Sequence, residues 1–178
     1  LLDPGLAFGT GTHPTTALCL EWLATAKLQG LRIIDYGCGS GILAIAAAKL
    51  GARLVWAVDN DPQALQATRV NAEKNGVAIC EGEVDAHLSP GIFISLPDDR
   101  RDFTADLLLA NILARPLIEF AAYFATLVRP ERHIILSGIL AGQVEDVRAA
   151  YATDFVLAPP VIRDGWARLE GRRKSAMV

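Results

Sequence analysis

The sequence has no long apolar run and few residues of the metal-binding types. No stretch approaches the roughly 20 apolar residues of a membrane-spanning helix, and no charged segment followed by an apolar one marks a secretory leader. The three cysteines (Cys19, Cys38 and Cys80) and the three histidines lack the spacing of a zinc site or a disulfide framework. These scarcities predict a cytosolic (cytoplasmic) protein with reduced thiols, no bound metal and no membrane partner.

An excess of basic charge is also lacking. The net charge is −3 and the pI is near 5.6, which argues against a protein that holds nucleic acid over a broad basic face. Apolar residues, in contrast, are abundant: they make up 52% of the 178 residues, and the mean hydropathy is +0.30. This length and composition predict a single domain, residues 1–178, whose target is a protein or a small molecule.

The clearest motif joins a strand to a helix through three alternate glycines. Apolar Leu31, Ile33 and Ile34 precede them, and a helical run over residues 42–50 follows at once. The glycines are Gly37, Gly39 and Gly41. Glycines in such a turn let the backbone adopt positive φ and approach a bound molecule, while the N–H groups of the new helix point the same way. The motif predicts a small ligand on the turn, in contact with Gly37 and Gly39.

Charge and spacing around this turn select the ligand. A dinucleotide fingerprint, G-x-G-x-x-G, would have glycine or alanine where Ile42 stands. Asp35, two residues before Gly37, would repel a pyrophosphate but suits a cationic amino group. The pattern D-x-G-x-G-x-G resembles motif I of the class I methyltransferases. That resemblance implies S-adenosylmethionine as the cofactor, with Asp35 facing the amino group of its methionine part.

A second strand ends in another acid. Residues 53–58 predict a buried parallel strand that ends at Asp59, where a carboxylate can accept hydrogen bonds from both ribose hydroxyls of a nucleoside. This placement supports a nucleoside ligand in a methyltransferase and in an NAD enzyme alike. Asp61-Pro62 predicts a helix cap, and the helix over residues 63–75 is expected to stop at Asn75-Gly76.

Two further strands are expected beyond this helix. Residues 77–81 are predicted as the third strand, and residues 82–104 as a long irregular connection. Residues 105–110 predict the fourth strand, which ends at Asn111 across the ligand crevice from the first strand. A helix over residues 113–127 follows, and the alternative to a functional role for Asn111 is that it only caps this helix.

The remaining chain completes a doubly wound sheet. Residues 132–137 predict a fifth strand and residues 140–151 a helix. Residues 155–162 and 166–172 predict a terminal hairpin turned at Asp164-Gly165. The predicted fold is therefore α/β, a doubly wound, seven-stranded, mostly parallel, Rossmann-like sheet with a C-terminal antiparallel hairpin. Class I methyltransferases end in such a hairpin.

Four separated segments resemble one methyltransferase family. Residues 1–16 resemble D-P-G-x-A-F-G-T-G-x-H-x-T-T, which opens the catalytic domain in the family that methylates the eleventh large-subunit ribosomal protein (PrmA). Motif I, residues 58–62 and Ala-Asn-Ile-Leu at residues 110–113 match in the same order, and residues 165–172 resemble the closing segment of the family. The resemblance implies that Thr16 contacts the cofactor and that residues 1–16 form a loop that closes over it.

The resemblance also implies a reaction. Methyl groups would pass from S-adenosylmethionine to amino groups of a protein, either lysine side chains or an N-terminal amine, of a large-subunit ribosomal protein. We hypothesise that the side-chain oxygen of Asn111, which would also contact the cofactor, and a nearby backbone carbonyl accept the amine hydrogens and turn the nitrogen lone pair toward the methyl carbon. The family carries a separate N-terminal domain that recognises the ribosomal protein, and we expect it to be absent from residues 1–178.

Other functions are kept as alternatives. One is a methyltransferase for another protein, an RNA base or a small amine, and others are a nucleoside-binding domain without catalysis and an NAD-dependent oxidoreductase. Ile42 and Asp35 disfavour the last of these. The run Arg172-Arg173-Lys174 is interpreted as a solvated tail, with contact to ribosomal RNA as the alternative, and no other direct nucleic-acid binding is expected.

Overall fold

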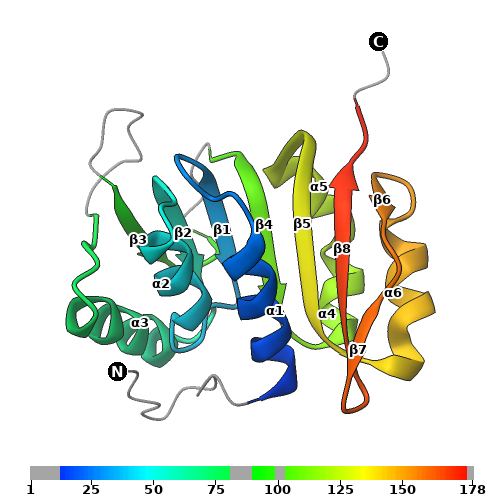
Figure 1. Ribbon diagram of the computed structural model, residues 1–178, viewed down its shortest axis with the longest axis horizontal. Helices are drawn as coiled ribbons and strands as arrows, with labels where there is room; N and C mark the ends of the chain where they lie inside the picture. The colour runs from blue at the N-terminus through cyan, green and yellow to red at the C-terminus, as the bar shows by residue number, and fades with distance from the viewer. Residues whose placement is uncertain (1–12, 81–89, 99–102, 176–178) are drawn as a thin grey trace.

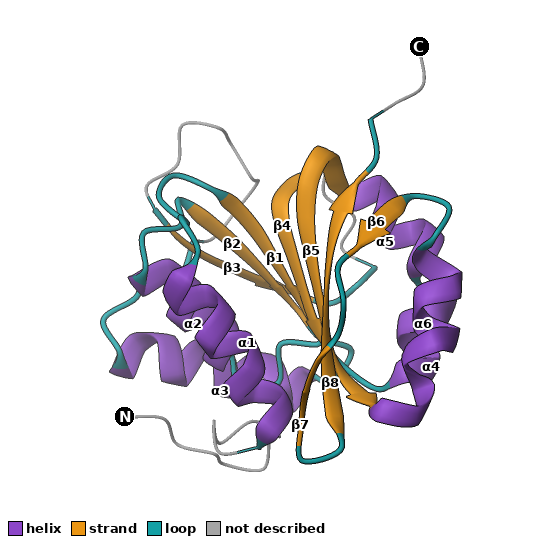
Figure 2. Ribbon diagram, turned by 45° about the vertical axis from the view of Figure 1, so that its right-hand side comes forward, coloured by secondary structure: helices purple, strands orange, loops and turns teal. Residues whose placement is uncertain are grey.

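The computed structural model describes residues 13–80, 90–98 and 103–175, which form one sheet covered by helices on both faces (Figures 1 and 2). The strands are β1 (Arg32–Tyr36), β2 (Leu54–Val58), β3 (Gly91–Ser95), β4 (Ala105–Asn111), β5 (Val128–Leu140), β6 (Phe155–Leu157), β7 (Val161–Arg163) and β8 (Trp166–Arg173). The helices are α1 (Pro14–Thr25), α2 (Ile42–Lys49), α3 (Pro62–Lys74), α4 (Ala114–Glu119), α5 (Ala121–Leu127) and α6 (Val144–Tyr151), with a 3₁₀ turn η1 (Ala141–Gln143).

The strand order is β3-β2-β1-β4-β5-β8-β6, and β7 pairs with β8. Strands β1 to β5 are mutually parallel, whereas β8 runs antiparallel to β5, β6 and β7. This confirms the predicted fold class. The described residues form eight strands rather than seven, because Pro159 and Pro160 divide the run over residues 155–162 into β6 and β7.

The predicted third strand is wrong. Residues 77–81 were expected to pair in the sheet, but their described part, residues 77–80, makes only an isolated bridge from Ile79 to Ile92. The third strand is instead β3, inside the segment predicted as irregular, and its residues pair in parallel with β2. Residues 78–80 lie along the outer edge of β3, where Gly91 allows a close approach: a Cβ there would lie 2.8 Å from the Ala78 carbonyl oxygen.

The three-layer packing follows from alternation along the strands. Ile33 packs among buried residues on the face covered by α1, α2 and α3, and its neighbour Ile34 packs on the face covered by α4, α5 and α6 (Figure 2). Strands buried on both faces read as continuous apolar runs, as the sequence of β2 does. The helix predicted over residues 113–127 is divided at Phe120 into α4 and α5.

The two edges of the sheet have different surroundings. We call the edge where the parallel strands end the carboxyl edge, and the edge where they begin the amino edge. The loops after β1, β2 and β4 leave from the carboxyl edge, which is where ligands bind in open α/β sheets. No helix within the described ranges is long and apolar enough to cross a membrane.

Candidate functional site at the carboxyl edge

The glycine turn after β1 has the geometry that its sequence predicts. The φ angles of Gly37, Gly39 and Gly41 are +79°, +54° and +78°, in the region that favours glycine. The N–H of Gly37 donates to the carbonyl oxygen of Val58 at 2.7 Å, which ties the turn to the end of β2. A Cβ on Gly37 would lie 2.2 Å from Cγ2 of Ile112, so the turn also packs against the loop that follows β4.

Two buried polar side chains of α3 support this turn, and the sequence analysis missed both. The Thr68 hydroxyl donates to the carbonyl oxygen of Gly39 at 2.9 Å, and the Asn71 amide donates to that of Ser40 at 3.0 Å. Thr68 and Asn71 are fully buried, 0% and 1% exposed. Polar residues on a helix usually face solvent. Thr68 and Asn71, three positions apart, instead lie on the buried face of α3 with Ala64 and Ala72, and this pattern could have identified them in the sequence.

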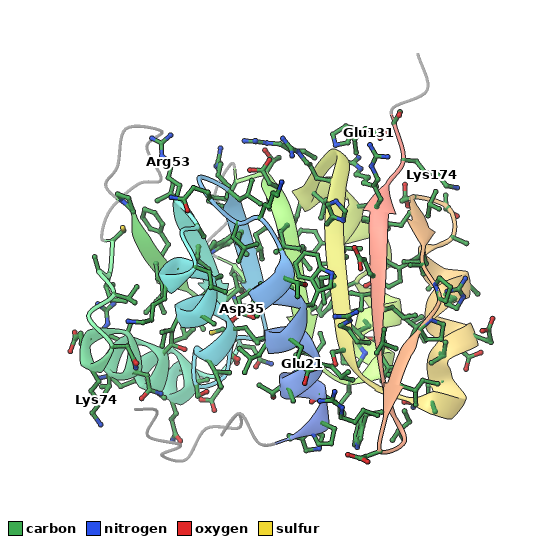
Figure 3. The ribbon with its side chains drawn as sticks, in the orientation of Figure 1. Glu21, Asp35, Arg53, Lys74, Glu131 and Lys174 are labelled. Atoms are coloured by element: carbon green, nitrogen blue, oxygen red, sulfur yellow. The ribbon has the colours of Figure 1, made fainter. Side chains whose placement is uncertain are left out.

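Asp35 is buried beneath the turn in β1. Its Oδ2 accepts the N–H of Ala44 in α2 at 2.9 Å, while Oδ1 has no hydrogen-bond partner within the part of the chain that the structure describes. Burial raises the pKa of this carboxyl to about 7; the Ala44 N–H opposes the shift and the charge of Asp59 adds to it. Figure 3 labels Asp35 in the centre of the fold. An unpaired oxygen on a buried acid is costly unless a ligand completes it.

Asp59 supports the glycine turn from the side of β2. Its Oδ2 accepts the N–H of Gly39 at 2.9 Å, and its Oδ1 accepts the N–H of Asp61 at 3.0 Å. The Asp61 side chain in turn accepts the N–H of Gln63 at 2.8 Å and caps α3, as predicted. The carboxylate of Asp59 thus lies directly beside the turn, at the end of the second strand.

Asn111 and Thr16, which are 95 residues apart in the sequence, meet at the end of β4. The Nδ2 of Asn111 donates to the hydroxyl oxygen of Thr16 at 3.3 Å. The start of α1 is fixed by Ser137 of β5, whose hydroxyl donates to the carbonyl oxygen of Thr15 at 3.1 Å. With Nδ2 committed to Thr16, Oδ1 is the group of the Asn111 amide that remains to accept a hydrogen bond.

All of the predicted site residues therefore lie at or just beneath the carboxyl edge. They are Thr16, Asp35, Gly37, Gly39, Asp59 and Asn111. Residues 1–12 of the predicted covering loop lie outside the described residues. No group of three or more potential metal ligands occurs within the described ranges, and Cys19, Cys38 and Cys80 are not paired in disulfides.

Ile112 fixes the position of Asn111 relative to the rest of the site. Its side chain packs on Gly37, and its backbone packs on Gly138 of β5, where a Cβ would lie 2.2 Å from the Ile112 carbonyl oxygen. Gly138 also has a φ of +83°. A glycine is thus required at residue 138 for the loop after β4 to approach β5 this closely.

We expect Gly138→Ala to lower the free energy of unfolding by about 2 to 4 kcal/mol, since a left-handed backbone and a backbone clash are both penalised. Gly30→Ala is the matched control, because Gly30 has a φ of +76° but no heavy atom within 4 Å of the Cβ position. In this control variant the free energy of unfolding should fall by only about 1 kcal/mol. Urea unfolding followed by circular dichroism measures both, and equal losses in the two variants would contradict the packing argument.

The chain matches a described protein family over nearly its whole length. A family model described as ribosomal protein L11 methyltransferase (PrmA) matches residues 1–174. A protein named ribosomal protein L11 methyltransferase from Pseudomonas putida strain F1 is 56% identical over 174 residues, and one from Azotobacter vinelandii is 55% identical over 175 residues. Each match covers 98% of this chain and 56% of the relative, so the chain spans just over half the length of these relatives.

Solved structures agree with this match. The ribosomal protein L11 methylase from Lactobacillus delbrueckii subsp. bulgaricus superposes with a TM-score of 0.81 at 35% identity, covering 97% of this chain and 84% of that one. An RNA methyltransferase from Salinibacter ruber, solved with S-adenosyl-L-homocysteine, shares the fold alone, with a TM-score of 0.66 at 15% identity and coverage of 91% and 94%. Together with the family match over residues 1–174, these results show that the chain belongs to the ribosomal protein L11 methyltransferase (PrmA) family.

Proposed function

We propose that this chain transfers methyl groups from S-adenosylmethionine to amino groups of a ribosomal protein, on lysine side chains or an N-terminal amine. The observation that carries the proposal is the Asn111 amide at the end of β4, whose Nδ2 is held by Thr16 and whose oxygen is the acceptor of that amide. Family membership supports the reaction type and the ribosomal substrate, because the relatives are named for L11. We propose residues 1–178 as a single catalytic domain, since the described strands form one sheet.

The buried acid in β1 fits the cofactor. Oδ1 of Asp35 lacks a partner within the described chain, and the adjacent Asp59 adds negative charge. A cationic amino group placed there would satisfy the oxygen and favour the ionised carboxylate, whereas a pyrophosphate would be repelled. Gly37 and Gly39 would let the methionine part approach the backbone, and Asp59, at the end of β2, would accept the ribose hydroxyls.

The reaction needs alignment more than acid or base strength. When bound, S-adenosylmethionine would supply an activated methyl group on a positively charged sulfur, which would keep the bonding electrons as the methyl group passes to a neutral amine. The chain must therefore hold a neutral amine with its lone pair aimed at the methyl carbon. Oδ1 of Asn111 would accept one amine hydrogen and set this direction, and Thr16 would fix the Asn111 side chain and contact the cofactor.

A methyl-label assay tests the proposal. The chain is incubated with tritium-labelled S-adenosylmethionine and either purified ribosomal protein L11, another ribosomal protein of similar charge, or ribosomal RNA. We expect label in L11 and none in the other two, with Asn111→Ala as the inactive control. Label in RNA alone, or in the second ribosomal protein as strongly as in L11, would overturn the proposed substrate class.

Calorimetry distinguishes the proposed methyltransferase from an NAD-dependent oxidoreductase. The proposal predicts binding of S-adenosylmethionine and no binding of NAD. Ile42 is the first residue of α2 and is buried in the core. A dinucleotide-binding turn has glycine or alanine at this position, so the turn after β1 lacks the dinucleotide fingerprint. Tight binding of NAD would contradict the proposal.

A further inference from the structure

Basic side chains collect along the amino edge of the sheet, opposite the candidate site. They lie near the starts of β1, β2 and β5 and at the end of β8. Strand β8 runs antiparallel to β5 and therefore ends at this edge. These residues, the arginine edge, are Arg32, Arg53, Arg129, Arg132, Arg172, Arg173 and Lys174. Acids are fewer along the same described segments, namely Asp106, Glu131 and Asp154.

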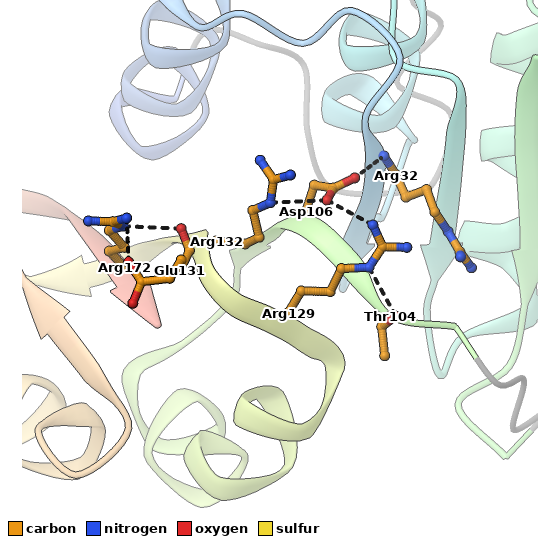
Figure 4. A network of polar contacts seen from close by, with 7 residues as sticks. All are labelled: Arg32, Thr104, Asp106, Arg129, Glu131, Arg132 and Arg172. Carbon is orange, nitrogen blue, oxygen red and sulfur yellow. Dashed lines mark hydrogen bonds and ion pairs between the residues drawn. The ribbon is translucent and has the colours of Figure 1, made fainter. Parts of the chain in front are cut away.

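Asp106 of β4 organises the centre of the arginine edge (Figure 4). Its side chain is only 7% exposed, and its Oδ1 lies 3.0 Å from Nη1 of Arg129 and 3.3 Å from Nε of Arg132. Its Oδ2 accepts the backbone N–H of Arg32 at 3.0 Å. The side chains of Arg129 and Arg132 are nevertheless 38% and 50% exposed, so one buried carboxylate holds two cations that are partly open to solvent.

The neighbouring guanidinium groups are also held in place. The guanidinium of Arg32 lies over the ring of buried Phe103, 4.3 Å from its centroid. Burial lowers the pKa of Arg32 and the nearby charge of Arg129 lowers it further, which indicates that these cations crowd one another. Arg172 donates to the carbonyl oxygen of Glu131 at 3.1 Å and pairs with the Glu131 carboxylate while staying 59% exposed.

A row of like charges costs free energy unless an anion lies along it. Figure 3 labels Arg53 toward one side of this edge and Lys174 toward the other, so the cations extend across the sheet rather than surround one pocket. An extended row of guanidinium groups matches the repeating phosphates of a nucleic-acid strand, because guanidinium binds phosphate oxygens in pairs. An acidic peptide offers the same charge sign without the regular spacing.

We propose that the arginine edge binds the phosphate backbone of RNA. The choice of RNA over DNA rests on the proposed function, because an acceptor from the ribosome lies beside ribosomal RNA. Arg129 and Arg132 contact phosphates, and RNA at the amino edge leaves the carboxyl edge open to the acceptor. The contacts are made to the backbone and carry no base sequence.

The test is fluorescence anisotropy of this 178-residue chain with a labelled 16-base-pair RNA duplex, between 50 and 200 mM NaCl. The variant Asp106→Asn/Arg129→Gln/Arg132→Gln removes the buried charge together with its partners, so that no carboxylate is left unpaired. We expect it to bind at least about tenfold more weakly at 50 mM NaCl. Its slope of log affinity against log salt should be shallower by about 2, since roughly 0.9 is lost for each phosphate contact on a duplex.

The matched control is Lys74→Gln/Arg115→Gln, which removes more net charge from exposed positions outside the arginine edge. It should bind RNA within about twofold of the parent chain. An equal loss in this control, equally tight binding of poly-glutamate, or no salt-dependent binding of the parent chain would overturn the proposal. The assay contains no methyl donor or acceptor, so failure of the proposed methyl transfer would not alter it.

Discussion

Asn111→Ala is expected to lower kcat for methyl transfer by roughly 100-fold at saturating S-adenosylmethionine, because the acceptor amine loses the group that directs its lone pair. The Kd for S-adenosylmethionine should rise by at most about fivefold, since one hydrogen bond contributes about 1 kcal/mol net. Single-turnover kinetics with the labelled donor measure kcat, and calorimetry measures Kd. This division between rate and affinity separates a catalytic role from a role in cofactor binding alone.

Thr16→Val provides the matched control for this role. It keeps the shape of the side chain but removes the oxygen that accepts the Nδ2 hydrogen of Asn111 at 3.3 Å. The amide is then less well oriented, and we expect a loss in kcat of about tenfold, smaller than for Asn111→Ala. Full transfer rate in Asn111→Ala, with the thermal unfolding midpoint unchanged, would show that the side chain does not act on the acceptor.

The site residues that end or directly follow a strand could be predicted from the sequence. Parallel strands buried on both faces read as apolar runs, so the residues that end them, such as Asp59 and Asn111, are visible as the first polar positions. Alternate glycines marked the turn after β1 in the same way. The hydrogen bond between Thr16 and Asn111 was not predicted, because it depends on how α1 packs against the sheet.

The features that the sequence analysis missed are set by pairing between distant segments. The choice between residues 77–81 and β3 as the third strand depends on which run pairs with β2, and both are apolar. Arg172-Arg173-Lys174 was interpreted as a solvated tail, and the antiparallel strand that carries Arg172 was predicted. The register of β8 against β5, which places Arg172 opposite His133 and near the start of β5, was not visible in the sequence. Net charge averages over the whole surface and therefore could not reveal this local excess of cations.

The affinity for a ligand that carries the methionine amino group should depend on pH through Asp35. In the unliganded chain burial raises the pKa of this carboxyl to about 7, so below pH 7 a proton must leave before the amino group can pair with Oδ1. Binding should therefore weaken as pH falls, by roughly 30-fold between pH 8 and pH 5.5. Calorimetry with S-adenosylhomocysteine, which keeps the amino group without the sulfonium charge, isolates this effect.

The same shift makes the unliganded fold less stable as pH rises. The folded-state pKa lies above the ordinary value of 3.8, so the native chain holds a proton that the unfolded chain has released, and stability falls from about pH 4 to about pH 7. Asp35→Asn, which is always neutral, should lose both pH dependences and bind the ligand at pH 8 at least about tenfold more weakly. An Asp35→Asn chain that kept the parent's pH slope for S-adenosylhomocysteine would show that another group titrates, and Asp35 would then not be the partner of the cofactor's amino group.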